Sequence, residues 1–529
     1  MSRERTRRTL GAVPFIALAA LGNALLYHAP LLSFAVANLD LTSFTGLLTL
    51  ASLLVALLAS TALPLLVLAL VSQRLLKPFC MIAAAGNAVA VYFIVTYQVV
   101  LDKTMMGNVR NTNAAEAFEL FHPTLLAYVV VLGVVPIALL TRVRLRPAPR
   151  LRLAGLGVAG ALVTILWAYL AGSTWLWFDH NAKKLGGMVL PWSYMVNLAR
   201  YQLPRLIGGD APIPLPPATF LSDERIVVVL VIGEAARPQN FQLYGYPRPT
   251  NPALTAAGVI ALQDTTACST YTTASIRCML SHLDSRSEFS KRYEPLPTYL
   301  QRHGVDVIWR SHNWGEPPLH VQTYQKAGEL AADCRGAGCE HDDVLLHGLE
   351  QRIRASSSSR SFVVLHQMGS HGPAYFSRYP PEFERFRPVC TSVELGQCAH
   401  DALVNAYDNT ILYTDHFLAR TIDLLRRFED RATLLIYMSD HGESLGEYGL
   451  YLHGTPWSIA PDVQKKVPFI VWMSEAFMRL RGVDAERVRA QPVHGQRDIF
   501  HTVLGALRMR SEVYRAEFDV FSPDYARTP

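Results

Sequence analysis

Charged residues are scarce in this 529-residue chain, at 17% of positions, and basic residues are missing from whole stretches of it. No lysine or arginine occurs between residues 30 and 44, and residues 98–123 hold only Lys103 and Arg110. Half of the residues are hydrophobic, and they concentrate in roughly the first third of the chain. A chain of this length is too long to fold around a single hydrophobic core, so we expect at least two domains, the first of them apolar.

Five apolar runs are near or above the length needed to cross a bilayer. They cover residues 11–29, 45–71, 79–97, 124–140 and 153–172. A buried soluble helix could explain one run, but five in series predict a transmembrane domain of five helices over residues 1–172. The charged start also fits a cleaved signal peptide, but the later runs favour a retained first helix.

Basic residues set the orientation, because lysine and arginine stay on the cytoplasmic side of a membrane. They gather before the first run, after the second and after the fourth: Arg3, Arg5, Arg7, Arg8, Arg74, Lys77, Arg142, Arg144, Arg146, Arg150 and Arg152. Together with Glu4, these three segments carry a net charge of +10. Because the whole chain has a net charge of +6, the rest of the chain is negatively charged. We expect a cytoplasmic N-terminus, and five crossings would put residues 173–529 on the outer side. The basic pI gives no support to nucleic-acid binding.

Cysteine is also scarce, and no pair has the Cys-x-x-Cys spacing of a zinc ribbon. Cys80 lies in the third apolar run and is expected to be a plain core residue. The other six lie in close pairs in the outer part: Cys268 with Cys278, Cys334 with Cys339, and Cys390 with Cys398. An even number in an oxidising compartment predicts disulfides, and we predict the nearest-neighbour pairing.

Residues 173–217 connect the membrane domain to the outer one. Residues 173–204 mix tryptophan and tyrosine with basic residues, which suits an interfacial helix on the membrane, although an ordinary surface helix fits as well. Four prolines between residues 212 and 217 then predict a stiff linker.

Short, unbroken apolar runs mark the strands of the outer domain, residues 218–529. They are Ile226–Ile232, Val305–Trp309, Phe362–Leu365 and Leu434–Met438. Such runs are typical of strands buried on both faces in a parallel sheet. Amphipathic stretches such as residues 402–427 lie between them, so we expect an α/β/α sandwich.

Polar side chains follow three of these strands. Glu234 follows the first, His371 the third, and Asp440 with His441 the fourth; His453 comes a little later. Because ligands sit beyond the carboxyl ends of the strands in open α/β sheets, these side chains should share one edge. Carboxylates and imidazoles together form a zinc ligand set, although a histidine after a strand can be a loop residue and Asp440 can cap a helix.

The segment from Cys268 to Cys278 is a candidate for the nucleophile. A helix is expected to start near Thr272 and Thr273, where a hydroxyl would sit among unpaired N–H groups and the positive end of the helix dipole. That environment suits an alkoxide beside a metal. From spacing alone, a threonine that only caps the helix fits as well, and the choice among Thr270, Thr272 and Thr273 is open.

Five long segments carry a more specific signal. They are VVVLVIGEAAR (227–237), CSTYTTASIRCM (268–279), HQMGSHGPAYF (366–376), NAYDN (405–409) and SDHGESLGEYGLYLHG (439–454). In these segments the chain closely resembles the phosphoethanolamine transferases that modify lipid A, including the mobilised colistin-resistance enzymes. The resemblance implies an alkaline-phosphatase and sulfatase type of fold on five transmembrane helices.

The resemblance also implies roles for residues. Glu234, Thr272, Asp440 and His441 match the main zinc ligands, with Thr272 as the nucleophile. His371 and His453 match residues that hold phosphate or a second zinc ion. Asn108, Thr112 and Glu116 match a lipid-facing periplasmic loop, and their spacing would put them on one helical face. A solvated polar face is the alternative for these three.

The implied reaction moves phosphoethanolamine from phosphatidylethanolamine to a phosphate of lipid A through a phospho-threonine, and diacylglycerol leaves. It implies a monomer in the inner membrane of a Gram-negative cell, a periplasmic catalytic domain and lowered susceptibility to polymyxin and colistin. One departure stands out. After Arg310, where the colistin-resistance enzymes carry a phosphate-contacting lysine, the chain has none, and His312, Asn313 and Glu316 are candidates to take part instead.

Other activities share this fold. A sulfatase needs a cysteine followed by arginine at the fourth position, and neither Cys268 nor Cys278 has one. A phosphoglycerol transferase of the glucan or teichoic-acid kind shares the fold and the threonine, and it is the main alternative. Transfer of phosphoethanolamine to another envelope glycan is a further one.

Overall fold

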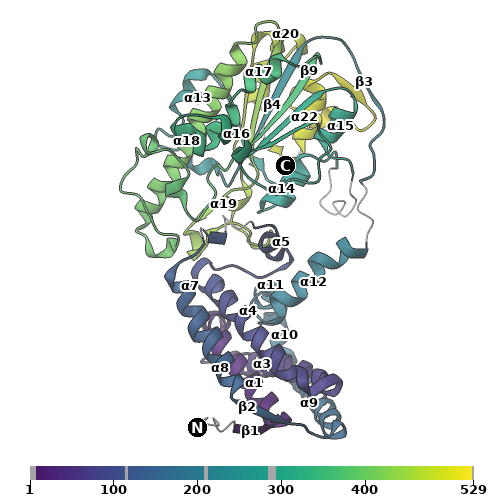
Figure 1. Cartoon of the computed structure of the whole chain (residues 1–529), viewed down its shortest axis with the longest axis vertical. Coiled ribbons are helices and arrows are strands. Elements are labelled where there is room, and N and C mark those ends of the chain that lie inside the picture. The colour runs from purple at the N-terminus through teal and green to yellow at the C-terminus, as the bar shows by residue number, and fades with distance from the viewer. Residues whose placement is uncertain are drawn as a thin grey trace, which may run out of the picture. The chain divides into compact units, whose positions relative to one another are not determined.

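The computed structural model describes residues 8–112, 117–118, 120–207, 212–283, 293–491 and 493–526. The chain divides into two compact units (Figure 1). The helical unit, as we call it, comprises Met1–Val109 and Phe121–Leu206, and the sheet unit comprises Arg110–Leu120 and Ile207–Pro529.

Long apolar helices build the helical unit. They are α1 (Ala12–Tyr27), α2 (Ala29–Ala37), α3 (Phe44–Ser72), α4 (Leu76–Tyr97), α7 (Pro123–Tyr128), the π-helix η2 (Val129–Val134), α8 (Val135–Thr141) and α9 (Arg150–Leu170). Within the described residues, three helical stretches are long and apolar enough to cross a membrane: Phe44–Tyr97, Pro123–Thr141 and Arg150–Leu170. The pair α1 and α2, bent by 62°, would make a fourth. Five crossings therefore stay a prediction.

The first of these stretches contains two helices that fold back on each other. Asn23 of α1 donates from Nδ2 to Thr61 of α3 at 3.0 Å, and its Oδ1 accepts from Asn87 of α4 at 3.0 Å. In one straight helix, Thr61 and Asn87 would lie about 39 Å apart, at about 1.5 Å per residue. The chain must therefore reverse between α3 and α4, at the turn Gln73–Leu75.

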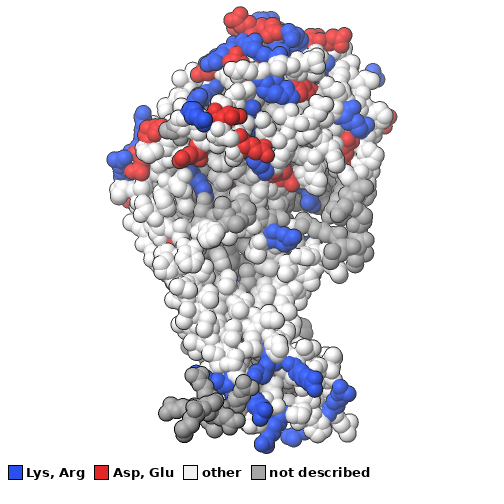
Figure 2. Space-filling model, viewed as in Figure 1, with Lys and Arg blue, Asp and Glu red and all other residues white. Residues whose placement is uncertain are grey.

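Basic residues gather at one end of the helical unit. Strand β1 (Arg8–Gly11) pairs in parallel with β2 (Val143–Arg146), and Lys77 donates to the carbonyl of Val143, so the three basic segments meet there. Figure 2 shows lysine and arginine at this end and a broad uncharged surface beside it. Val158 of α9 is 62% exposed, as expected of helices that face lipid rather than a protein core.

The segment after α9 differs from the single interfacial helix expected over residues 173–204. It forms α10 (Trp175–His180), α11 (Ala182–Gly186) and, after a break, α12 (Trp192–Ile207). Gly187 and Pro191 lie in the break, because glycine is a weak helix former and proline lacks the N–H that a helix interior needs. Trp192 donates to the carbonyl of Ser60 at 2.7 Å, which anchors the start of α12 on α3.

A seven-stranded sheet forms the centre of the sheet unit, in the order β5-β13-β10-β4-β9-β7-β8. Its strands are β4 (Ile226–Gly233), β5 (Ile260–Leu262), β7 (Asp306–Ser311), β8 (Thr323–Lys326), β9 (Arg360–His366), β10 (Ala432–Ser439) and β13 (Phe469–Met473). Strands β10, β4, β9, β7 and β8 are parallel, whereas β13 is antiparallel to both of its neighbours. The four strands predicted from apolar runs are therefore the adjacent ones, β10, β4, β9 and β7.

Helices cover both faces of the sheet, which explains its continuous apolar runs. The even-numbered residues of β4 pack in one core with α15 (Leu296–Arg302) and α22 (Asp498–Ala506). The odd-numbered residues Val227, Val229 and Val231 pack in the other with α18 (His400–Arg426). Figure 1 shows α18 on one side of the sheet and α15 and α22 on the other. A strand buried on both faces has no reason to alternate with polar residues.

Three disulfides join the cysteines in the predicted nearest-neighbour pairs: Cys268–Cys278, Cys334–Cys339 and Cys390–Cys398.

The proline-rich segment 212–217 packs on the sheet unit and is not a free spacer. Leu215 is buried, its N–H donates to Glu294 and its carbonyl accepts from Arg302. Prolines limit the conformations of this segment, but tertiary hydrogen bonds fix its position.

Candidate active site

Two neighbouring strands bring two carboxylates together. Gly233 of β4 lies opposite Ser439 of β10, so the next residues, Glu234 and Asp440, leave the sheet side by side. Both are fully buried, as is His441. His441 Nε2 lies 3.3 Å from Glu234 Oε1 and 3.2 Å from Asp440 Oδ2. The parallel strands thus place three predicted ligands in one group.

Thr272 reaches this group from a different element. It is the first residue of α14 (Thr272–Met279), and the disulfide Cys268–Cys278 ties the last turn of this helix to the segment that precedes it. Thr272 Oγ1 lies 3.3 Å from Glu234 Oε2 and 3.3 Å from His441 Nε2. Thr270, by contrast, donates its hydroxyl to the carbonyl of Thr455. Of the candidate threonines, Thr272 is the one whose hydroxyl contacts the carboxylate and imidazole group.

Buried oxygens in the group fit a cation. Within the described part of the chain, Glu234 Oε1 and Asp440 Oδ2 are buried and accept no hydrogen bond of regular geometry, although His441 Nε2 lies 3.3 and 3.2 Å from them. A buried carboxylate oxygen without such a partner is costly. Ligand atoms of Glu234, His441 and His453 also lie within 4.8 Å of one another. Carboxylate oxygen, imidazole nitrogen and a hydroxyl are donors that a divalent ion such as zinc accepts.

The electrostatics of the group are those of a site that needs positive charge. Burial, reinforced by the charge of Glu234, raises the pKa of Asp440 well above its usual range. Burial alone would lower the pKa of His441, but Asp440 and Glu234 outweigh it and raise this pKa to about 10. Burial also opposes ionisation of Glu234, yet His441 holds its pKa well below the usual range. The proton on His441 offsets the negative charge of the two carboxylates, and a bound divalent cation would replace that proton.

His453 is held by partners that the sequence did not reveal. Its Nδ1 lies 2.8 Å from Glu443 Oε2, and the Tyr375 hydroxyl donates to Glu443 Oε1 at 2.5 Å. The ring of His453 lies 4.0 Å from that of His441, measured between centroids. A carboxylate that accepts from one histidine nitrogen orients the other nitrogen toward a metal or phosphate. Glu443 lies inside the motif SDHGES, next to the ligands, but its direction depended on the fold.

His371 lies at the rim of the group. Its ring centroid is 6.2 Å from that of His453 and 5.0 Å from that of Trp314. Burial lowers the pKa of His371 to about 3, so the ring is neutral near pH 7. A neutral imidazole can ligate a metal or donate one hydrogen bond to a phosphoryl oxygen.

Asn313 is the member of the segment after Arg310 that reaches the group. Its Nδ2 donates to Glu234 Oε2 at 2.8 Å, which fixes that carboxylate. His312 instead pairs with Asp342, and Glu316 pairs with Lys326 at 2.7 Å. Lys326 also donates to the main-chain carbonyl of Asn313 at 3.0 Å. A lysine of β8 therefore supports this segment, which has no lysine of its own.

The predicted lipid-facing loop is only partly described. Helix α5 (Lys103–Asn111) ends before Thr112, so the shared helical face does not extend to that residue. Asparagine and threonine are weak helix formers, and the sequence Asn111-Thr112-Asn113 accounts for the end. Glu116 and the side chain of Asn108 lie outside the described residues, so the role of this loop stays a prediction.

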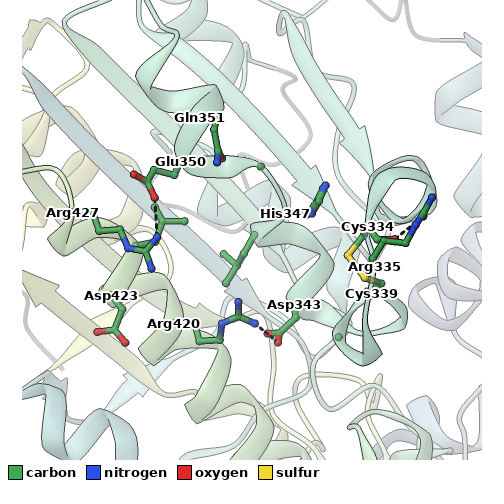
Figure 3. Close-up of a pocket in the computed structure, with 14 residues that line it drawn as sticks. Cys334, Arg335, Cys339, Asp343, His347, Glu350, Gln351, Arg420, Asp423 and Arg427 are labelled. Atoms are coloured by element: carbon green, nitrogen blue, oxygen red, sulfur yellow. Dashed lines mark hydrogen bonds and ion pairs between the residues drawn. A yellow bond between two sulfur atoms is a disulfide. The ribbon is translucent and has the colours of Figure 1, made fainter.

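The sheet unit also has a pocket of about 490 Å³ that none of the candidate active-site residues lines (Figure 3). It lies beside the disulfide Cys334–Cys339. Arg420 pairs with Asp343 at 2.6 Å, and Arg427 pairs with Glu350 at 3.0 Å. These two positive charges are already balanced by carboxylates, so we assign no chemistry to this pocket.

Known proteins share both halves of the chain. Residues 226–509 match the sulfatase family, and residues 59–205 match the family described as phosphoethanolamine transferase EptA/EptB. Phosphoethanolamine transferase EptA of Helicobacter pylori is 38% identical over 508 residues, 94% of each chain. Phosphatidylethanolamine transferase Mcr-1 of Escherichia coli is 32% identical over 434 residues, 76% of this chain and 79% of the relative.

A solved structure agrees over the full length. The integral membrane lipooligosaccharide phosphoethanolamine transferase A (EptA) from Neisseria meningitidis covers 99% of this chain and 100% of its own, with a TM-score of 0.88 and 28% identity. The sheet unit is thus a sulfatase-type domain of the alkaline-phosphatase fold. The chain belongs to the EptA family and is a phosphoethanolamine transferase, which confirms the resemblance seen in the sequence.

Proposed function

We propose that this enzyme transfers phosphoethanolamine from phosphatidylethanolamine to a phosphate of lipid A, with Thr272 as nucleophile and zinc as cofactor. The observation that carries the proposal is the position of the Thr272 hydroxyl, 3.3 Å from both a carboxylate oxygen and an imidazole nitrogen. The names of the relatives, which include a lipooligosaccharide transferase and a phosphatidylethanolamine transferase, support the acceptor and the donor.

Glu234, Thr272, Asp440 and His441 would hold one zinc ion, and His371 and His453 would hold a phosphoryl group or a second ion. When bound, zinc supplies positive charge that lowers the pKa of the threonine hydroxyl and offsets charge on the phosphoryl oxygens. Because α14 begins at Thr272, the unpaired N–H groups of its first turn add positive potential at the same place.

In the first half-reaction, Thr272 Oγ1 attacks the phosphorus of phosphatidylethanolamine. The bond from phosphorus to the glycerol oxygen breaks, diacylglycerol leaves with a proton, and phosphoethanolamine stays on the threonine. In the second half, a phosphate oxygen of lipid A attacks the same phosphorus, the bond from phosphorus to Thr272 Oγ1 breaks, and Oγ1 regains a proton from the attacking phosphate group. The buried, neutral His371 and the oriented His453 would bind the phosphoryl oxygens in both halves.

The helical unit would place this chemistry at a membrane. We propose that α1 with α2, α3, α4, the α7–α8 stretch and α9 make five crossings, with the basic end in the cytoplasm of a Gram-negative cell and the sheet unit in the periplasm. The clustering of arginines and lysines at one end supports this orientation. We expect the enzyme to act as a monomer.

Mass spectrometry of the lipids tests the proposal. The full chain, phosphatidylethanolamine and lipid A should yield lipid A heavier by one phosphoethanolamine group, with one diacylglycerol per transfer, and Thr272→Ala should yield neither. If lipid A stays unmodified and another envelope glycan gains the group, that glycan is the acceptor. A gain of phosphoglycerol would favour the phosphoglycerol transferase instead.

A further inference from the structure

A pocket of about 540 Å³ opens in the helical unit, and no residue of the candidate active site lines it. The residues that line it include Phe34, Asn38, Gln98, Tyr128, Lys184 and Met188. Helices α1 and α4 both start at the basic end of the unit, and both reach the pocket with their last turns. In the proposed topology, the pocket therefore lies in the outer leaflet.

Lys184 gives the pocket one unbalanced positive charge. Its Nζ lies 4.3 Å from the centroid of the Phe34 ring. Among the residues that the structure describes, no carboxylate forms an ion pair with Lys184, and no acidic residue lines the pocket. In the sheet unit, Lys326 and Lys466 each pair with a carboxylate. A lysine without such a partner, on the wall of a pocket, fits an anion such as a phosphate.

Two amide side chains, those of Asn38 and Gln98, line the pocket and can supply neutral acceptors. Asn38 Nδ2 donates to the carbonyl of Phe34 at 2.8 Å, and Gln98 Nε2 donates to the carbonyl of Val95 at 3.1 Å. A carbonyl can only accept, so the NH₂ group of each amide must face it, and each Oδ1 or Oε1 is left as an acceptor. Gln98 ends α4 at a φ of 56°, a left-handed conformation that glutamine rarely adopts. Two such oxygens can accept hydrogen bonds from an ammonium group.

Apart from Ser33 and Tyr128, the remaining walls are apolar, and they open to the surface of the helices. Val91 and Met188 are buried there, whereas Leu26 and Val95 are 45% and 41% exposed. The volume suits a headgroup with its glycerol backbone, within the range of small-molecule pockets. Acyl chains attached to it would continue along the exposed apolar side chains of α1 and α4.

We propose that this pocket binds phosphatidylethanolamine, as a donor-holding site separate from Thr272. The lipid phosphate lies against Lys184, the ammonium against the amide oxygens of Asn38 and Gln98, and the acyl chains along α1 and α4. The assignment rests on the proposed function for its membrane placement and for the identity of the lipid. One cation and two neutral acceptors match a zwitterionic headgroup better than an anionic one.

Native mass spectrometry of the full chain with added lipid tests the site. The parent carries Thr272→Ala, so that bound donor is not consumed. Lys184→Gln should weaken retention of phosphatidylethanolamine by about fivefold, the effect of one partly exposed charge pair. The matched control is Lys183→Gln, which removes the same charge from the same helix at a residue that does not line the pocket. Equal retention in the Lys184 and Lys183 variants would overturn the proposal.

Phosphatidylglycerol, which has the phosphate but no ammonium, tests the headgroup. The parent should retain phosphatidylethanolamine more strongly, and Asn38→Ala with Gln98→Ala should remove that preference. Equal retention of the two lipids by the parent would overturn the assignment. With Thr272 intact, Lys184→Gln should raise KM for the donor and leave kcat nearly unchanged. Lipid retention that depends on Lys184, in an enzyme that transfers no phosphoethanolamine, would refute the proposed function and leave the pocket standing.

Discussion

Glu443→Gln should weaken zinc binding while it preserves the fold. Glu443 is fully buried, and its two oxygens are engaged by His453 at 2.8 Å and by Tyr375 at 2.5 Å. If His453 presents Nε2 to the metal, Nδ1 carries the proton and donates to Glu443. Glutamine has one side-chain oxygen, so it can accept from His453 or from Tyr375, but not from both.

The size of the effect follows from the lost charge. A hydrogen bond to a charged group is worth about 1.5–3 kcal/mol, against about 1 kcal/mol for a neutral one. Replacing the charged acceptor by a neutral one therefore removes roughly 0.5–2 kcal/mol from the orientation of His453, which corresponds to a loss of zinc affinity of about two- to thirtyfold. Turnover should fall at limiting zinc and recover in part at excess zinc.

Competition with a chelator would measure the zinc affinity of the full chain, and lipid A modification would measure turnover. Tyr375→Phe is the matched control, because it removes one donor to Glu443 but leaves the bond to His453. Its zinc affinity should fall by less than about twofold, because the charged acceptor of His453 is kept. Zinc affinity and turnover at wild-type levels in Glu443→Gln would show that Glu443 does not orient a ligand.

Three further predictions concern stability, the disulfides and the biological effect. Burial raises the pKa of Asp415 from 3.8 to about 6. The folded state thus holds a proton that the unfolded state loses, so stability falls as pH rises from about 4 to 6, and Asp415→Asn should remove up to about 3 kcal/mol of this fall in melts across that range. Serine at Cys268 and Cys278 should reduce turnover more than serine at Cys390 and Cys398, because the first disulfide braces Thr272; equal effects would contradict this role. Expression in a Gram-negative host should raise polymyxin tolerance by weakening peptide binding about tenfold, and Thr272→Ala should match an empty vector.

The parts of the site that follow directly from parallel strands could be predicted from the sequence. Glu234, Asp440 and His441 each come after an apolar run, and the carboxyl ends of parallel strands share an edge. The four central strands were visible for the same reason, since burial on both faces removes polar alternation. The sulfatase-type fold and the enzyme class followed from the longer motifs.

Other features depend on tertiary contacts that no local pattern encodes. The polar strand β8 and the three-residue strand β5 are too short or too mixed to be seen as apolar runs. Glu443 gains its role only because the antiparallel pairing of Ser444–Leu445 with Tyr451–Leu452 returns His453 to it. Lys326 gains its role only because β8 lies beside β7. The bend of 62° between α1 and α2 falls at His28, at the end of the apolar run over residues 11–29, and hydropathy carries no information about the direction of a helix.

The most direct test of the account is the mass of an adduct trapped on the enzyme. The full chain, incubated with phosphatidylethanolamine and no acceptor, should carry one phosphoethanolamine group on Thr272 and release one diacylglycerol. Peptide mapping should place the group on Thr272, because its hydroxyl is the one that contacts Glu234 and His441. An adduct on Thr270 or Thr273, or turnover that persists in Thr272→Ala, would contradict the central claim.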